Sequence, residues 1–182
     1  PLYLQDVAAV AALPLPWEKL DGRTLVLSGA TGLIGSCLVD VLHERGCKCT
    51  LVALGRSEQR ARERFAACWD SPLFHFVECD INDPLSLGVQ ADYVLHLASN
   101  THPLQYATDP VGTIMTNIRG LGNMLEYARG CGSGVRFAFA SSNEVYGENR
   151  GDVELFDEQY CGYIDCNTLR AGYPESKRCG EA

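Results

Sequence analysis

Short apolar runs alternate with longer amphipathic stretches along most of the chain. The apolar runs occupy residues 23–29, 49–55, 73–80, 92–99 and 135–142. Runs of this length that are rich in Val, Leu and Phe predict buried β-strands. Helical periodicity lies between them, in residues 30–46, 57–69 and 111–132. This alternation predicts an α/β domain, in which helices cover both faces of a doubly wound parallel sheet.

Apolar side chains mark one face of each of the first two predicted helices. In the first helix, Ile34, Leu38 and Val41 recur at helical spacing. In the second, which is highly charged, Phe65 and Trp69 fall on one side. We therefore predict that both segments are amphipathic helices.

Residues 1–22 and 143–172 fall outside this alternation. The N-terminal stretch is apolar, but it lacks a basic leader and contains Asp6, which argues against a signal peptide. We predict an N-terminal extension, with a short helix packed on the outside of a single domain that spans residues 23–182. The second stretch is acidic and loop-rich, and long irregular loops in compact domains are usually functional.

The composition is that of a globular domain with an acidic surface. Of the 182 residues, 46% are hydrophobic and 21% are charged, which suits one well-buried domain. The net charge of −8 argues against a nucleic acid bound over a broad face. It still permits one phosphate-bearing small molecule held by backbone amides and a few arginines. No apolar run approaches the ~20 residues that span a bilayer, so we predict no membrane partner.

Nine cysteines are present, an odd number without any Cys-x-x-Cys pair. This pattern favours neither a disulfide framework nor a zinc site, and we predict no bound metal. Several of the cysteines, such as Cys37 and Cys79, lie within apolar runs. We interpret them as reduced, mostly buried thiols of a cytoplasmic protein.

The turn after the first predicted strand reads GATGLIG and carries Gly29, Gly32 and Gly35. Glycines at this place permit a tight turn, let backbone amides approach a pyrophosphate, and allow close packing of helix on strand. An incidental glycine-rich turn is the alternative, but the position between a buried strand and an amphipathic helix favours dinucleotide binding. The remaining residues of the motif that we assign to the cofactor are Thr31, Leu33 and Ile34.

The end of the second predicted strand bears on the choice of cofactor. An NAD-specific site usually has an acidic residue about 20 positions after the glycine turn, to bind the adenosine ribose. Here that place holds Gly55, Arg56 and Ser57. Arg56 would suit a 2′-phosphate, which gives a slight preference for NADP(H), although a solvated arginine at a helix start explains it nearly as well.

Further candidates follow the third and fourth predicted strands, because ligands of open α/β sheets lie at the carboxyl ends of strands. Asp80 and Ile81 are placed to meet the adenine edge, although Asp80 could equally cap the next turn. After the fourth strand we assign Leu97, Ala98 and Ser99 to the cofactor, and Asn100 and Thr101 to the substrate. For His102 and Tyr106 a ligand contact and an ordinary packed or solvated side chain both stay open, whereas His96 is expected to be a satisfied core residue.

Four motifs appear in an order that resembles the extended short-chain dehydrogenase/reductases, the NAD-dependent epimerase/dehydratase family. They are GATGLIG, HLAS, SSNEVYG and YPESK. The resemblance covers about residues 23–182 and implies a Rossmann-type fold. It also implies that a smaller substrate domain follows in the complete protein, so we expect this chain to be a partial one that ends within or just after the catalytic helix.

The resemblance assigns roles to residues near the end of the chain. Tyr173 is the expected base and Lys177 its partner. Independently of the family, Tyr and Lys at i and i+4 share one helix face, and an ammonium beside a phenol favours the phenolate. Ser142 matches the catalytic serine or threonine, ahead of Ser141, and Asn117 matches a buried asparagine beside the cofactor site. A surface Tyr-Lys pair of no function is the alternative.

Asn143 and Glu144 bear on the reaction. The resemblance implies a glutamate near carbon 5 or 6 of the sugar in decarboxylases and 4,6-dehydratases, and an acidic residue before it in the dehydratases. Asn143 has no such proton to give, which favours decarboxylation. We assign both residues to the substrate site, with Asn143 as a hydrogen-bond partner of the sugar and Glu144 as a catalytic residue that organises the site or manages a proton. A plain capping role for Glu144 stays open.

The expected function is therefore transient oxidation at carbon 4 of a nucleotide sugar, with the strongest resemblance to UDP-glucuronate decarboxylases. The alternatives are 4,6-dehydration, 4-epimerisation and, in another class, a dinucleotide-binding protein without turnover. The resemblance also implies a homodimer formed through the long helical segment and the helix near Tyr173. Because Pro174 disfavours a helical Tyr173, that helix should begin there or be distorted.

Overall fold

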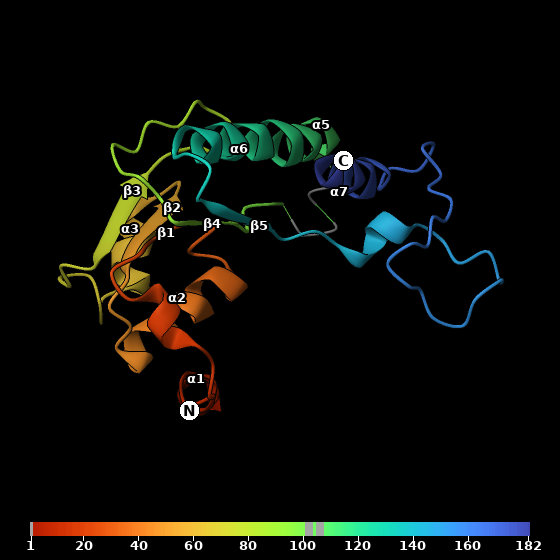
Figure 1. The fold of residues 1–182 in the computed structure, drawn as a ribbon. Coiled ribbons are helices and arrows are strands. Elements are labelled where there is room, and N and C mark those ends of the chain that lie inside the picture. The colour runs from red at the N-terminus through yellow and green to blue at the C-terminus, as the bar shows by residue number, and fades with distance from the viewer. Residues whose placement is uncertain (1, 101–103, 105–107) are drawn as a thin grey trace.

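A computed structural model describes residues 2–100, 104 and 108–182 of the chain. Its centre is a five-stranded sheet with the order β3-β2-β1-β4-β5, in which every adjacent pair is parallel (Figure 1). The strands are β1 (Thr24–Ser28), β2 (Thr50–Gly55), β3 (Phe74–Glu78), β4 (Tyr93–His96) and β5 (Arg136–Phe139). The predicted parallel sheet is confirmed, and each observed strand lies within the apolar run that was predicted to form it.

Helices cover both faces of the sheet. In Figure 1, α5, α6 and α7 run along the upper face, and α2 lies on the opposite side with α1 beneath it. The helices are α1 (Leu2–Ala11), α2 (Leu33–Arg45), α3 (Glu58–Arg64), α5 (Pro110–Met115), α6 (Leu121–Gly130) and α7 (Gly172–Glu181). A π-helical turn, Thr116–Gly120, joins α5 to α6 into one long helix, and 3₁₀ turns span Trp17–Leu20 and Asn143–Tyr146.

The central strands β1 and β2 are buried on both sides, where successive side chains point to opposite faces. Leu25 and Leu27 of β1 pack in the cluster that contains residues of α2 and α3. Val26 lies between them in sequence but belongs to the cluster on the other face, with Met124 of α6. This double burial explains why the strands are almost wholly apolar.

Two details of the predicted helices are wrong. The helix predicted over residues 57–69 ends at Arg64, because Phe65 leaves helical geometry and is buried against the ring of Phe74, with 5.3 Å between ring centroids. Trp69 also packs on this cluster, but from a turn. On α2, Ile34 does not share the buried face of Val41, since the first turn of the helix faces a cavity.

The cysteines are free, but fewer of them are buried than predicted. Cys49 and Cys68 are buried, and four others are half-buried. Three are exposed, namely Cys161, Cys166 and Cys179. The exposed ones belong to the irregular loop and to α7, where no sheet covers them.

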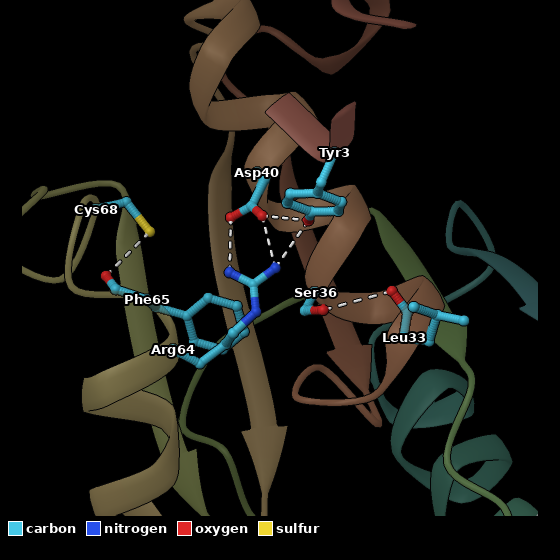
Figure 2. Close-up of polar contacts among 7 residues, drawn as sticks. All are labelled: Tyr3, Leu33, Ser36, Asp40, Arg64, Phe65 and Cys68. Carbon is cyan, nitrogen blue, oxygen red and sulfur yellow. Dashed lines mark hydrogen bonds and ion pairs between the residues drawn. The ribbon is translucent and has the colours of Figure 1, made fainter. Parts of the chain in front are cut away.

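The N-terminal helix α1 packs on the outer side of α2 through Val7, Ala11 and Val41. A polar cluster reinforces this contact (Figure 2), in which Arg64 of α3 donates to both carboxylate oxygens of Asp40, at 3.1 and 2.6 Å. The same guanidinium donates to the hydroxyl of Tyr3 at 2.8 Å, and that hydroxyl donates to Asp40. The extension is therefore joined to the domain by apolar contact and by the Tyr3 hydroxyl, which bonds to both members of the bidentate Arg64–Asp40 ion pair. In the described part of the chain, every helix is too short or too polar to cross a lipid bilayer.

We predict that Gly35→Ala destabilises the domain by about 1–3 kcal/mol, because the added Cβ would lie 2.4 Å from the carbonyl oxygen of Gly29. Gly122→Ala is the matched control, since Gly122 lies within α6 with open space around its Cβ position. That substitution should stabilise by about 0.5–1 kcal/mol. Urea unfolding followed by circular dichroism measures both, and equal shifts of the two variants would contradict the close packing at Gly35.

Candidate functional site

A cavity of about 520 Å³ opens where the carboxyl ends of all five strands meet. It is bounded by the turn after β1, by α2, and by the first turns of α7. The predicted site residues in its wall are Gly29, Thr31, Gly32, Leu33, Ile34, Gly35, Arg56, Asp80, Ile81, Leu97, Ala98, Ser99, Asn100, Tyr173 and Lys177. The fold thus brings residues from distant parts of the sequence to one place.

The glycine turn is shaped by contacts that exclude a side chain. Gly29 has φ +69°, and a Cβ there would lie 2.8 Å from the backbone nitrogen of Ala98. The amide of Gly32 donates to the carbonyl of Gly29 at 3.0 Å, and α2 begins at the next residue without a side-chain cap. The first amides of α2 therefore keep free donors at the positive end of the helix dipole.

This part of the cavity fits a dinucleotide phosphate. The turn offers backbone donors in a cradle that only glycines leave open, which suits a pyrophosphate. Leu33 and Ile34 are 86% and 67% exposed and give the mouth of the cavity an apolar lip. Such exposed apolar side chains at the start of a helix suit contact with a bound ligand.

Arg56 lies at the end of β2 in the cavity wall, is exposed, and makes no hydrogen bond or ion pair within the described residues. Its neighbour Ser57 does not line the cavity, because its hydroxyl caps α3 and accepts from the amide of Arg60 at 3.3 Å. Asp80 does line the cavity, and its carboxylate also accepts from the amide of Asn82 at 2.9 Å. Asp80 therefore caps the next turn, as one of the two sequence-based alternatives had it, and it also lines the cavity.

Helix α7 brings Tyr173 and Lys177 into the same wall, and both are buried. The helix begins at Gly172, so Pro174 falls in its first turn, where a missing N–H breaks no helical hydrogen bond. The ammonium of Lys177 donates to the carbonyl oxygen of Ala140 at 2.7 Å and lies 5.9 Å from the centre of the Tyr173 ring. Burial lowers the pKa of Lys177 to about 8.

A buried hydrogen-bond chain fixes α7 against the rest of the site. The Ser99 hydroxyl donates to the amide oxygen of Asn117 at 2.7 Å, and the Asn117 amide group donates to the Ser176 hydroxyl at 2.8 Å. Ser176 in turn donates to the backbone oxygen of Tyr173 at 2.9 Å. Asn117 itself lies behind the cavity wall, on the π-helical turn, which is a common feature of functional sites.

His96 is a core residue, as predicted, but only one of its ring nitrogens has a partner. Its Nδ1 lies 2.6 Å from the Ser28 hydroxyl, and its ring stacks on Phe139 with 5.8 Å between centroids. Its Nε2 is buried without a hydrogen bond among the described residues. Burial, and secondarily the charge of Lys177, lowers the pKa of His96 to about 4, so this histidine is neutral at physiological pH.

The predicted residues after β5 lie outside this cavity. The Ser142 hydroxyl accepts from the amide of Glu144 at 3.2 Å and caps the 3₁₀ turn. Asn143 is exposed, and the carboxylate of Glu144 forms an ion pair with Arg170 at 2.8 Å. Ser141, ranked below Ser142 from the sequence, does line the cavity, and its hydroxyl donates to a carboxylate of α7. Thr101, His102 and Tyr106 lie outside the described residues.

A model of the NAD dependent epimerase/dehydratase family matches residues 25–182. The chain belongs to this family. UDP-glucuronic acid decarboxylase 2 of Arabidopsis thaliana is 33% identical over 180 residues, which make up 98% of this chain and 38% of that protein. UDP-glucuronic acid decarboxylase 1 of Xenopus tropicalis is 33% identical over 165 residues, 90% of this chain and 37% of that protein. The chain thus spans about two fifths of the length of these relatives.

Solved structures of the epimerase/dehydratase type share the fold. An epimerase of Methanothermobacter thermautotrophicus superposes with a TM-score of 0.72 at 24% identity, over 91% of this chain and 47% of that one. A dTDP-glucose 4,6-dehydratase of Bacillus anthracis, solved in complex with NAD, gives a TM-score of 0.68 at 17% identity, over 88% of this chain and 48% of that one. The Rossmann-type fold is thereby shown. Membership of an NAD-dependent family supports a nicotinamide dinucleotide as the cofactor.

The sequence reading missed part of the cavity wall of this epimerase/dehydratase chain. The missed lining residues are Leu54, Cys79, Asn82, Thr116 and Ala140, whereas Gly55 and Ser141 were noted in the sequence but not assigned to the cofactor. Most of them directly end or follow a strand, so the rule that placed Asp80 would have found them too. Thr116 had no such signal, because it comes from the long helix, where the side chain of Asn82 donates to its hydroxyl at 3.4 Å.

We predict a pH-dependent cost of burying Lys177. Its pKa is lowered in the folded chain, so between about pH 8 and 10.5 the unfolded chain binds more protons and the free energy of unfolding rises with pH. Across this window, the free energy of unfolding of the native protein should rise by roughly 2–3 kcal/mol relative to that of Lys177→Met. Denaturant unfolding in reducing buffer measures the difference at each pH. Lys48→Met, at an exposed lysine, is the control, and a flat difference for Lys177→Met would refute the lowered pKa.

Proposed function

We propose that the protein is an NAD(P)-dependent enzyme that modifies nucleotide sugars, and that it decarboxylates UDP-glucuronate. The observation that carries the proposal is the convergence of Tyr173 and Lys177 on the cavity lined by the glycine turn. A protein that only bound dinucleotide would have little use for a buried ammonium beside a phenol. The names of the curated relatives support the decarboxylase over other members of the family.

Tyr173 is proposed to remove the proton from the 4-hydroxyl of the sugar. The Lys177 ammonium is held by the carbonyl of Ala140 and lies 5.9 Å from the centre of the phenol ring. A dinucleotide held by the glycine turn would supply a reversible hydride acceptor for carbon 4, and oxidation there makes the sugar a β-keto acid that can lose carbon dioxide. Ser142 is the proposed hydrogen-bond donor to the same sugar oxygen, and Ser141, in the cavity wall, is the alternative.

Asn143 and Glu144 support decarboxylation over 4,6-dehydration. A dehydratase needs an acid to protonate the departing 6-hydroxyl, and the amide of Asn143 has no such proton. Decarboxylation of a β-keto acid needs no such acid. Glu144 is proposed to organise the site through its ion pair with Arg170.

A homodimer is proposed through the long helix. Its exposed side includes Val111, Met115, Ile118 and Leu125, which recur at intervals of three, four or seven residues and so lie along one stripe. Apolar stripes of this kind on a helix suit burial against another helix.

We propose a cytoplasmic location for the protein, since the cysteines are free and a reducing compartment keeps thiols in that state.

The decisive test is to incubate the full natural chain, loaded with NAD or NADP, with UDP-glucuronate and separately with UDP-glucose and dTDP-glucose. We predict carbon dioxide and a UDP-pentose from the first substrate alone. Tyr173→Phe should lower turnover at least 100-fold and change dinucleotide binding less than twofold. Tyr93→Phe, at the amino end of β4, is the control. A 4-keto-6-deoxy sugar as product would indicate a 4,6-dehydratase instead, and an epimer would indicate a 4-epimerase. Turnover by Tyr173→Phe would refute the role of Tyr173 as the base.

We also propose a slight preference for NADP(H), based on the guanidinium of Arg56 in the cavity wall, which has no hydrogen bond or ion pair among the described residues. Arg56→Ala should weaken NADP(H) binding about tenfold, because a charge-assisted hydrogen bond to the 2′-phosphate is lost. Binding of NAD(H) should change less than threefold. Fluorescence titration compares the two cofactors, with Arg60→Ala on the exposed side of α3 as the control. Equal losses for both cofactors would remove the basis of the preference.

A further inference from the structure

A second hollow, of about 420 Å³, lies beside the first turn of α7, away from the dinucleotide cavity. Its walls come from the segment after β5 and from the irregular loop that leads into α7. Three carboxylates line it, those of Glu144, Glu148 and Asp165. Arg170 is the only cation among the described lining residues, so any negatively charged ligand group must meet it there.

The ion pair between Arg170 and Glu144 joins the two segments that carry the proposed catalytic hydroxyls. Glu144 follows Ser142 by two residues, and its amide donates to the Ser142 hydroxyl. Arg170 precedes Tyr173 by three residues, and its backbone oxygen accepts from the Tyr173 amide at 3.2 Å. The guanidinium is therefore joined through short stretches of chain to both proposed catalytic hydroxyls.

The hollow keeps its shape without this ion pair. Arg178 of α7 donates to the backbone oxygens of Val145, at 2.8 Å, and Gly162, at 3.2 Å. The amide of Gly162 donates to the backbone oxygen of Tyr146 at 2.7 Å. These backbone contacts hold the loop against the 3₁₀ turn and α7, so the shape of the hollow does not depend on the ion pair between Arg170 and Glu144.

Stability alone gives little reason for an arginine at this place. The side chains of Arg170 and Glu144 are 56% and 32% exposed, and solvated ion pairs of this kind contribute little to folding. A guanidinium has five donors in a planar fork, so one carboxylate partner does not exhaust it. A second carboxylate could share the guanidinium or replace Glu144.

We propose that Arg170 determines substrate specificity by binding the carboxylate of a uronic acid sugar, in competition with Glu144. The inference rests on the proposed function and names the residue that selects an acidic sugar over a neutral one. Glu148 and Asp165 sharpen the selection, because they repel a carboxylate that is not paired with Arg170. Hydrogen bonds from the backbone and side-chain amides of Asn167 lower the pKa of Asp165, so its charge persists at physiological pH.

The test uses the full natural chain loaded with NAD, and calorimetric titration with UDP-glucuronate and with UDP-glucose. The native protein should prefer UDP-glucuronate. Arg170→Gln should weaken UDP-glucuronate binding about 10- to 100-fold, the value of one charge-assisted hydrogen-bonded contact, and UDP-glucose binding less than threefold. Arg170→Lys should retain part of the preference. Glu144→Gln should increase it, because the competing carboxylate is gone.

Arg150→Gln is the control, since Arg150 is an exposed arginine of the same loop that pairs with Asp152 outside the hollow. The proposal is overturned if Arg170→Gln weakens both ligands equally and lowers the melting temperature, which would make the ion pair a structural link only. It is also overturned if the native protein does not bind UDP-glucuronate or does not prefer it. Decarboxylation with an unchanged preference in Arg170→Gln refutes this inference alone, whereas a charge-dependent preference without decarboxylation refutes only the proposed reaction.

Discussion

The site depends on the close approach of two backbone segments at the carboxyl ends of β1 and β4. Gly29 has its φ angle in the left-handed region and lies so near Ala98 that no side chain fits between them. Below this contact, the Ser28 hydroxyl accepts from the Ala98 amide at 3.3 Å and lies 2.6 Å from the ring nitrogen of His96. Gly35 closes the arrangement by bringing α2 against the same turn. Because the strands are fixed by their parallel register, these contacts fix the direction in which α2 presents its first amides.

Helix α7 is fixed to this turn indirectly, through buried polar groups. Asn117 is 1% exposed and connects Ser99, after β4, to Ser176 of α7. Lys177 adds a second connection, to the carbonyl of Ala140 after β5. Hydrogen bonds that are both buried and satisfied are costly to break. The phenol of Tyr173 thus keeps a set position relative to the dinucleotide cavity, although more than 130 residues separate it in sequence from the glycine turn.

Much of this fold follows from sequence, and the exceptions have a common cause. Strands buried on both faces leave an unmistakable apolar signal, and the glycine turn and the Tyr-Lys pair are local patterns that depend on backbone geometry. The end of α3 at Arg64 depends instead on where Phe65 finds a partner across the core, which periodicity does not encode. The ion pair of Glu144 with Arg170 joins an irregular loop to a 3₁₀ turn, and neither segment has a repeat that would place its side chains.

The proposed ligands are anionic although the net charge of the protein is −8, and local geometry resolves this conflict of charge. Screening by physiological salt limits surface charges to a range of about 8 Å, so the net charge of −8 acts weakly at any one site. Within that range, the dinucleotide cavity offers the amino end of α2 and the guanidinium of Arg56, and the second hollow offers Arg170. For an anionic ligand, the attraction of a few hydrogen-bond donors at contact distance exceeds the repulsion of many remote carboxylates. The acidic residues around Arg170 then act against anions that lack the right geometry, which turns an overall repulsion into selectivity.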